Sequence, residues 1–115
     1  MNPLRRKLSS FLIETAHKDI NALDPQSVCA KELSNIKDVD AVIAETVEKI
    51  CQAATLAEIS KFLFLTARLK GASGRKRESI KSDIKKIAEI VVARVEAESG
   101  FLKLPQSCRI ILLGV

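Results

Sequence analysis

The chain has 115 residues, of which 47% are hydrophobic and 29% are charged, and this composition is typical of one folded domain rather than a disordered chain. Its four aromatic residues are all phenylalanine, so the core must be aliphatic and a stacking surface for single-stranded bases is not expected. The net charge is +5 but uneven: residues 68–86 carry eight basic and two acidic side chains, whereas residues 14–66 carry five basic and nine acidic ones.

The apolar pattern predicts an all-α fold, with four to five antiparallel helices in a bundle. The first helix covers about residues 3–22, because Asn2 can cap it and Pro3 suits the first helical position. Its apolar side chains recur at helical spacing: Leu4, Leu8, Phe11, Leu12, Ala16, Ile20 and Leu23. Asp24 and Pro25 form a turn, and we expect a short helix over residues 25–36.

The next helix begins at Asp38 or Asp40, either of which can cap it. The sequence from Thr55 to Glu58 matches a capping box, so we predict a break there and a separate helix over residues 56–70. The alternative is one helix over residues 40–70 whose apolar face rotates. Apolar side chains surround the axis at residues 62–65, which predicts a deeply buried helix or an interface.

Residues 71–74 are the clearest flexible loop, and a long helix over residues 75–99 follows, with Gly100 as its terminator. A stripe of branched residues runs along it: Ile80, Ile84, Ile87, Val91 and Val95. This spacing is close to that of a coiled-coil seam, but we favour a core-facing stripe. The seam interpretation leaves a homo-oligomer open.

The residues after Pro105 have a different character. Residues 108–115 are mostly branched and apolar, which predicts a strand or an extended arm. Because a lone strand leaves its backbone groups unpaired, we expect this arm to bind a partner protein. We therefore divide the single domain into a helical part, residues 1–106, and a C-terminal arm, residues 107–115. The expected partner-binding residues are Ile110, Ile111, Leu112 and Leu113.

Positive charge gathers where helix physics disfavours it, in the first turn of the last long helix and of the first helix. A helix N-terminus favours acidic side chains and binds anions, so cations there suggest a polyanionic partner. We interpret them as contacts to a nucleic-acid backbone that read no sequence; the alternative is a solvated helix face. The expected contact residues are Arg68, Lys70, Arg75, Lys76, Arg77, Lys81, Lys85 and Lys86, with Arg5, Arg6 and Lys7 as a second cluster.

The sequence offers no catalytic, cofactor or metal motif. His17 is the single histidine and is expected on a helix surface. The spacing of Cys29, Cys51 and Cys108 matches no zinc site, so we expect buried thiols in a reducing, intracellular setting. The longest apolar run, residues 110–113, is too short to span a membrane.

Together these patterns favour a non-catalytic accessory subunit in the cytoplasm that binds the backbone of DNA or RNA. It would belong to a larger replication, repair or RNA-processing assembly, with at least one protein partner, no membrane contact and no cofactor. The alternative is a protein–protein adaptor that docks an acidic partner through its basic helix start and its C-terminal arm. A self-assembling structural protein is a third reading.

Overall fold

A computed structural model describes residues 2–100 and 102–113, and this part of the chain is helical without strands. The predicted all-α class is therefore confirmed. The elements in chain order are α1 (Pro3–Asn21), α2 (Val28–Ser34), α3 (Val39–Ala53), α4 (Leu56–Leu69), α5 (Gly74–Ser99), the 3₁₀ turn η1 (Gln106–Cys108) and α6 (Ile110–Leu113).

Side-chain caps set the helix starts. Asn2 caps α1 as the sequence predicts, and Asp38, one of the two predicted candidates, caps α3; each accepts a backbone N–H of the first turn. The short helix α2 begins three residues later than expected. Asp24 accepts the N–H of Gln26 in a turn, and Ser27 provides the cap instead.

The predicted break between α3 and α4 is confirmed. The Thr55 hydroxyl accepts the Glu58 N–H (3.1 Å), and the Glu58 carboxylate accepts the Thr55 N–H (2.8 Å), which completes the capping box. The alternative prediction, a single helix over residues 40–70, is wrong. No single helix of the described residues is long and apolar enough to cross a membrane; α3 and α4 have the length and composition only as a pair, and that pair is bent by 118°.

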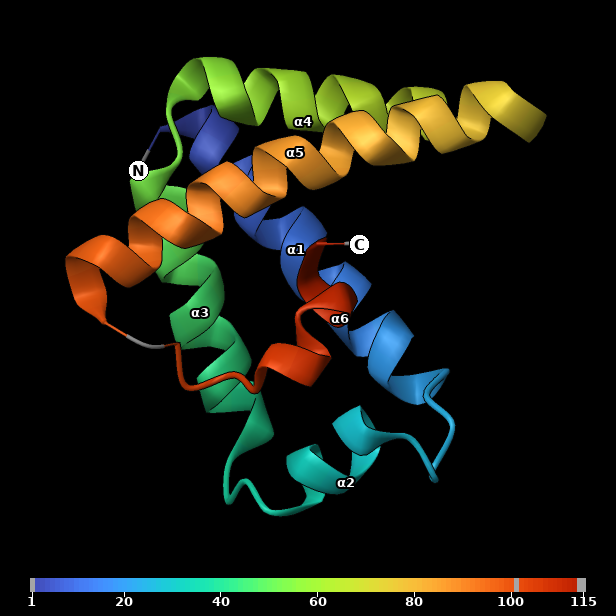
Figure 1. Cartoon of the computed structure of the whole chain (residues 1–115). Coiled ribbons are helices and arrows are strands. Elements are labelled where there is room, and N and C mark those ends of the chain that lie inside the picture. Colours follow the sequence, from blue (N-terminus) through green and yellow to red (C-terminus); the bar gives the residue numbers. More distant parts are fainter. Residues whose placement is uncertain (1, 101, 114–115) are drawn as a thin grey trace.

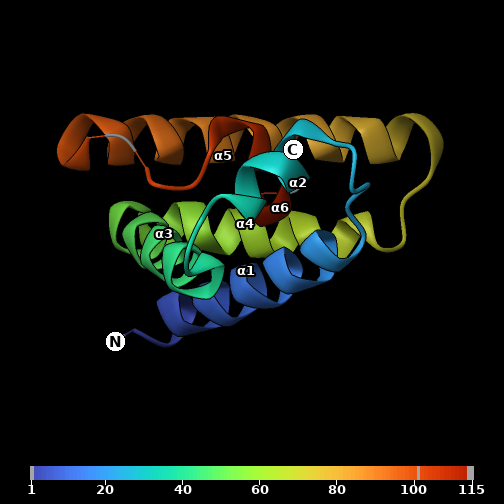
Figure 2. The same cartoon turned by 90° about the horizontal axis from the view of Figure 1, so that it is seen from below.

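The helices pack in layers around one aliphatic core. Helices α4 and α5 lie side by side and run in opposite directions (Figure 1). Seen from below, α5 lies along one side of the molecule and α1 along the other, with α3 and α4 between them (Figure 2). The stripe on α5 faces this core, since Ile80, Ile84, Val91 and Val95 are buried, so the coiled-coil seam is not needed to explain it. Helix α4 is not buried all round, because Phe64 is 59% exposed.

The C-terminal segment is not the strand or extended arm that the sequence suggests. Its described residues form η1 and the single turn α6, which packs on α1. Ile111 and Leu112 are almost fully buried, so these two expected partner-binding residues belong to the chain's own core. The side chains of Ile110 and Leu113 lie outside the described residues. Apolar burial against α1 has overridden the local preference of branched residues for a strand.

Two of the three cysteines are joined. Cys29 at the start of α2 and Cys108 in η1 form a disulfide, with Cα atoms 5.0 Å apart. Both side chains are buried. The prediction of free thiols is therefore wrong for this pair and holds for Cys51, whose burial raises its thiol pKa to about 11. The disulfide connects α2 to the C-terminal segment across 79 residues of chain.

Candidate nucleic-acid interface

The end of α4 and the start of α5 form a projecting tip at one end of the molecule (Figure 1). We call the predicted contact residues within the range 68–86 the tip cluster, and most of their side chains are exposed. Its members are Arg68, Lys70, Arg75, Lys76, Arg77, Lys81, Lys85 and Lys86. The structure thus brings cations from two helices and one loop to the same end of a hairpin, and from there Lys81, Lys85 and Lys86 continue along α5 as far as its middle.

The start of α5 is unusual for a helix N-terminus. Ser73 occupies the N-cap position but makes no side-chain capping hydrogen bond, and the first turn contains no acidic residue. The first backbone N–H groups therefore lack the acceptors that usually satisfy them. Arg75 and Lys76 stand beside these groups and add charge to the positive end of the helix dipole.

The cations surround α5 rather than forming one stripe. At about 100° per residue, Lys81 and Lys85 share one flank of the helix. Arg75 and Lys86 share the outward face, and Lys76 lies on the opposite flank. Cations on several sides of α5 suit a polyanion that crosses the hairpin, because phosphates on either side of the helix would each meet a cation.

Some members of the tip cluster have other partners. Arg77 is half-buried and donates to the Leu69 carbonyl oxygen (3.1 Å), so it satisfies the C-terminal end of α4. Arg68 lies over the Phe64 ring, 5.6 Å from its centre, and Lys85 is 4.0 Å from Glu89. Within the described residues, Arg75, Lys76, Lys81 and Lys86 form no ion pair.

The second predicted cluster lies elsewhere. The first turn of α1 contacts the α3–α4 junction, so α4, with a length of about 20 Å, separates it from the tip (Figure 1). Arg5 donates to the carbonyl oxygens of Ala54 (2.7 Å) and Cys51, which end α3. It therefore has a structural role, and only Arg6 and Lys7 of this cluster are exposed.

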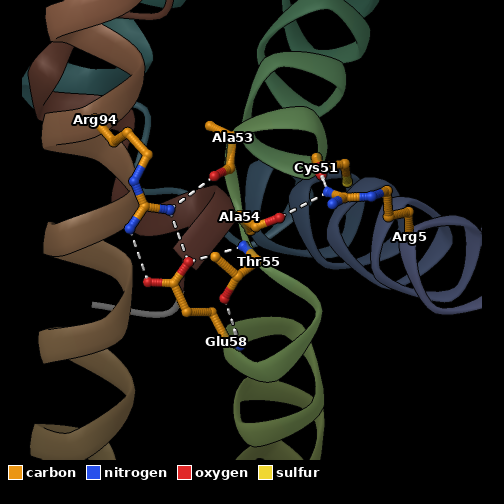
Figure 3. A network of polar contacts seen from close by, with 7 residues as sticks. All are labelled: Arg5, Cys51, Ala53, Ala54, Thr55, Glu58 and Arg94. Carbon is orange, nitrogen blue, oxygen red and sulfur yellow. Dashed lines mark hydrogen bonds and ion pairs between the residues drawn. The ribbon is translucent and has the colours of Figure 1, made fainter.

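A polar network that the sequence did not reveal lies at the α3–α4 junction (Figure 3). Arg94 of α5 binds the Glu58 carboxylate through two nitrogens (2.7 and 3.1 Å) and also donates to the Ala53 carbonyl oxygen (2.7 Å). The Arg94 hydrogen bonds, aided by the Thr55 N–H, lower the pKa of Glu58 to about 2. In the sequence, only the capping box pointed to a role for Glu58. No local pattern connects Glu58 to Arg94, which lies 36 positions away.

The other titratable groups singled out in the sequence do not converge. The Nδ1 atom of His17 lies 3.9 Å from a carboxylate oxygen of Asp40, and both side chains are exposed. Among the described residues, no three histidine, cysteine or acidic side chains gather where they could hold a metal ion. Comparisons with protein-family models, with curated proteins and with solved structures found no match to this chain.

Proposed function

We propose that this chain is a non-catalytic accessory subunit that binds a nucleic-acid backbone through the tip cluster. The observation that supports the proposal is the start of α5, where Arg75 and Lys76, which form no ion pair with any described residue, stand in a first turn that has neither a side-chain cap nor an acidic residue. In the isolated protein, these cations are repelled by the positive end of the helix dipole, which is electrostatically unfavourable. Bound phosphates would make the electrostatic energy of this site favourable.

The chemistry of the tip also defines how binding would behave. With four phenylalanines and no tyrosine or tryptophan, the chain offers little to stack on bases, so contacts fall on phosphates. Binding would tolerate any sequence and would weaken steeply with salt as counterions are released. The proposal includes an antiparallel helix bundle, a protein assembly around this subunit and an intracellular location. It does not include the reducing setting that the sequence suggests, because disulfides such as Cys29–Cys108 are rare where thiols are kept reduced.

Fluorescence anisotropy with labelled duplex DNA and RNA at increasing salt tests this function. The tip variant is Lys76→Gln/Lys81→Gln/Lys86→Gln, which changes exposed side chains only. Loss of three phosphate contacts should reduce the slope of log affinity against log salt by up to about 2.7. The matched control removes the same charge elsewhere, from the exposed side chains Lys31, Lys37 and Lys61.

Equal weakening in the tip variant and in the control would mean that net charge alone attracts the nucleic acid, and the proposed interface would be wrong. Absence of binding at low salt would reject the function itself.

A second candidate function is an adaptor for an acidic protein segment. Phe64 is 59% exposed beside Arg68, and Leu56 is 42% exposed on the same helix. Aromatic and arginine side chains are enriched at protein interfaces. In this adaptor function the acidic partner would contact the exposed side chains of α4 and not the C-terminal segment. Substituting Phe64→Ser should then abolish complex formation while leaving nucleic-acid binding unchanged.

A further inference from the structure

A groove of about 380 Å³ lies between α1, α4, α5 and α6, next to the tip. Its apolar lining comes from all four helices: Phe11, Phe62, Leu69, Ile84 and Leu112. The hydroxyl-bearing residues Thr15 and Thr66 add to this lining. This volume lies within the range of small-molecule sites and gives room for on the order of a dozen non-hydrogen atoms, at about 30 Å³ each.

The charged residues of the groove are mostly of one sign. Lys18 of α1, Lys70 of the α4–α5 loop and Arg77 of α5 line it from three segments, against one acidic residue, Asp19. Lys18 and Lys70 are exposed. Arg77 uses one nitrogen for the Leu69 carbonyl, and a guanidinium has donors to spare for another acceptor. An apolar lining with cationic residues from three segments is complementary to a ligand with an apolar body and an anionic end.

We propose that this groove binds a single-chain amphiphilic anion, with its apolar chain over the partly exposed side chains of Phe11 and Leu69 and its anionic group between Lys18, Lys70 and Arg77. The size of the groove corresponds to a medium-length chain, and decanoate, with twelve non-hydrogen atoms, matches it. The site shares Lys70 and Arg77 with the tip cluster, whereas Arg75, Lys76, Lys81 and Lys86 do not line the groove.

The test uses the complete chain and titrates decanoate below the concentration at which it aggregates. We expect saturable binding at one site per chain, with nuclear Overhauser contacts from the decanoate chain to Phe11 and Leu69. Decan-1-ol, of the same length without the charge, should bind at least tenfold more weakly. Decyl phosphate separates the two sources of an anionic head: equal binding means a general anion site, and weaker binding means a site for carboxylates.

Two variants with the same loss of charge make the assignment specific. Lys18→Gln/Lys70→Gln removes two groove cations and should weaken decanoate binding about tenfold. Lys76→Gln/Lys86→Gln removes two tip cations outside the groove lining and should leave decanoate binding unchanged. Equal effects of the two variants, equal binding of decan-1-ol, or no saturable binding would each overturn the proposal.

Discussion

The disulfide between Cys29 and Cys108 should contribute strongly to stability when it is intact. It closes a loop of 79 residues, and the chain-entropy relation gives about 4.5 kcal/mol for a loop of that length. Both ends lie in short elements, α2 and η1, which pack on each other. Reduction should therefore lower the free energy of unfolding by several kcal/mol.

The assay is urea unfolding followed by circular dichroism, with and without a phosphine reductant. The wild-type protein should lose about 4.5 kcal/mol on reduction, whereas Cys29→Ala/Cys108→Ala should not respond to the reductant. Cys51→Ala is the matched control, because it removes a buried cysteine outside the disulfide and should keep the full response. Before reduction, the denatured wild-type chain should expose one reactive thiol.

Three reactive thiols in the unreduced, denatured chain would refute this reasoning, because they would show that the two cysteines remain apart. A wild-type stability that reductant leaves unchanged would refute the energetic part, because the cross-link would then not restrict the unfolded chain. The comparison uses one sequence in two redox states, so loss of core packing through substitution cannot produce the expected difference.

Three more predictions concern the packing of the helices. Glu58→Gln should destabilise the fold by about 2 kcal/mol near neutral pH, after allowance for solvent screening. The pKa of Glu58 in the folded protein is about 2, below the ordinary 4.5, so the stabilisation by its carboxylate is complete above pH 4.5 and is lost as the pH falls towards 2. Acid unfolding of the wild-type protein and of the variant checks this pH dependence. Arg5→Ala should cost roughly 1–3 kcal/mol in urea unfolding because it leaves two carbonyls of α3 without their donor, whereas its exposed neighbour Arg6→Ala should cost under about 0.5 kcal/mol. Ile84→Ala should cost roughly 2–5 kcal/mol, measured by thermal unfolding, because Ile84 is 3% exposed and its loss leaves a cavity.

Local signals in the sequence were sufficient for most of the helices. The side-chain caps bind partners within three residues: Asn2, Asp38, and the pair Thr55 and Glu58. Both partners of each interaction are therefore visible in the local sequence. Gly100 ends α5 with a φ of 78°, a conformation that glycine adopts without strain. The all-α class follows from these signals together with the apolar spacing.

Interactions between distant residues could not be found in this way. Burial on α1 determines that residues 110–113 form a helical turn, and the local preference of branched residues points to a strand. The disulfide joins residues 79 positions apart, and Arg94 meets Glu58 across 36 positions. Neither pair has a local pattern, because only the packing of α2 on η1 and of α4 on α5 brings the partners together.

Three arginines have hydrogen-bond partners that account for their position in the fold. Arg5, Arg77 and Arg94 each donate to a carbonyl oxygen at or just beyond the end of α3 or α4, where helix carbonyls lack partners and the dipole favours cations. A planar guanidinium suits this role, because its donors can reach two acceptors at once. The positive charge of these arginines is thus explained by the fold itself.

Among the exposed cations that the fold does not explain, which also include Lys31, Lys37 and Lys61, the residues Arg75, Lys76, Lys81 and Lys86 lie together on the first half of α5. They have no ion-pair partner within the described part of the chain. They are mostly lysines, whose compact charge on a flexible stem contacts phosphates without fixed geometry. Arg75 and Lys76 stand in the first turn of α5, which has no acidic residue, and Lys81 and Lys86 follow along the helix. A structural role would favour an acidic or capping residue here, and this is why we propose an anionic partner for this end of α5.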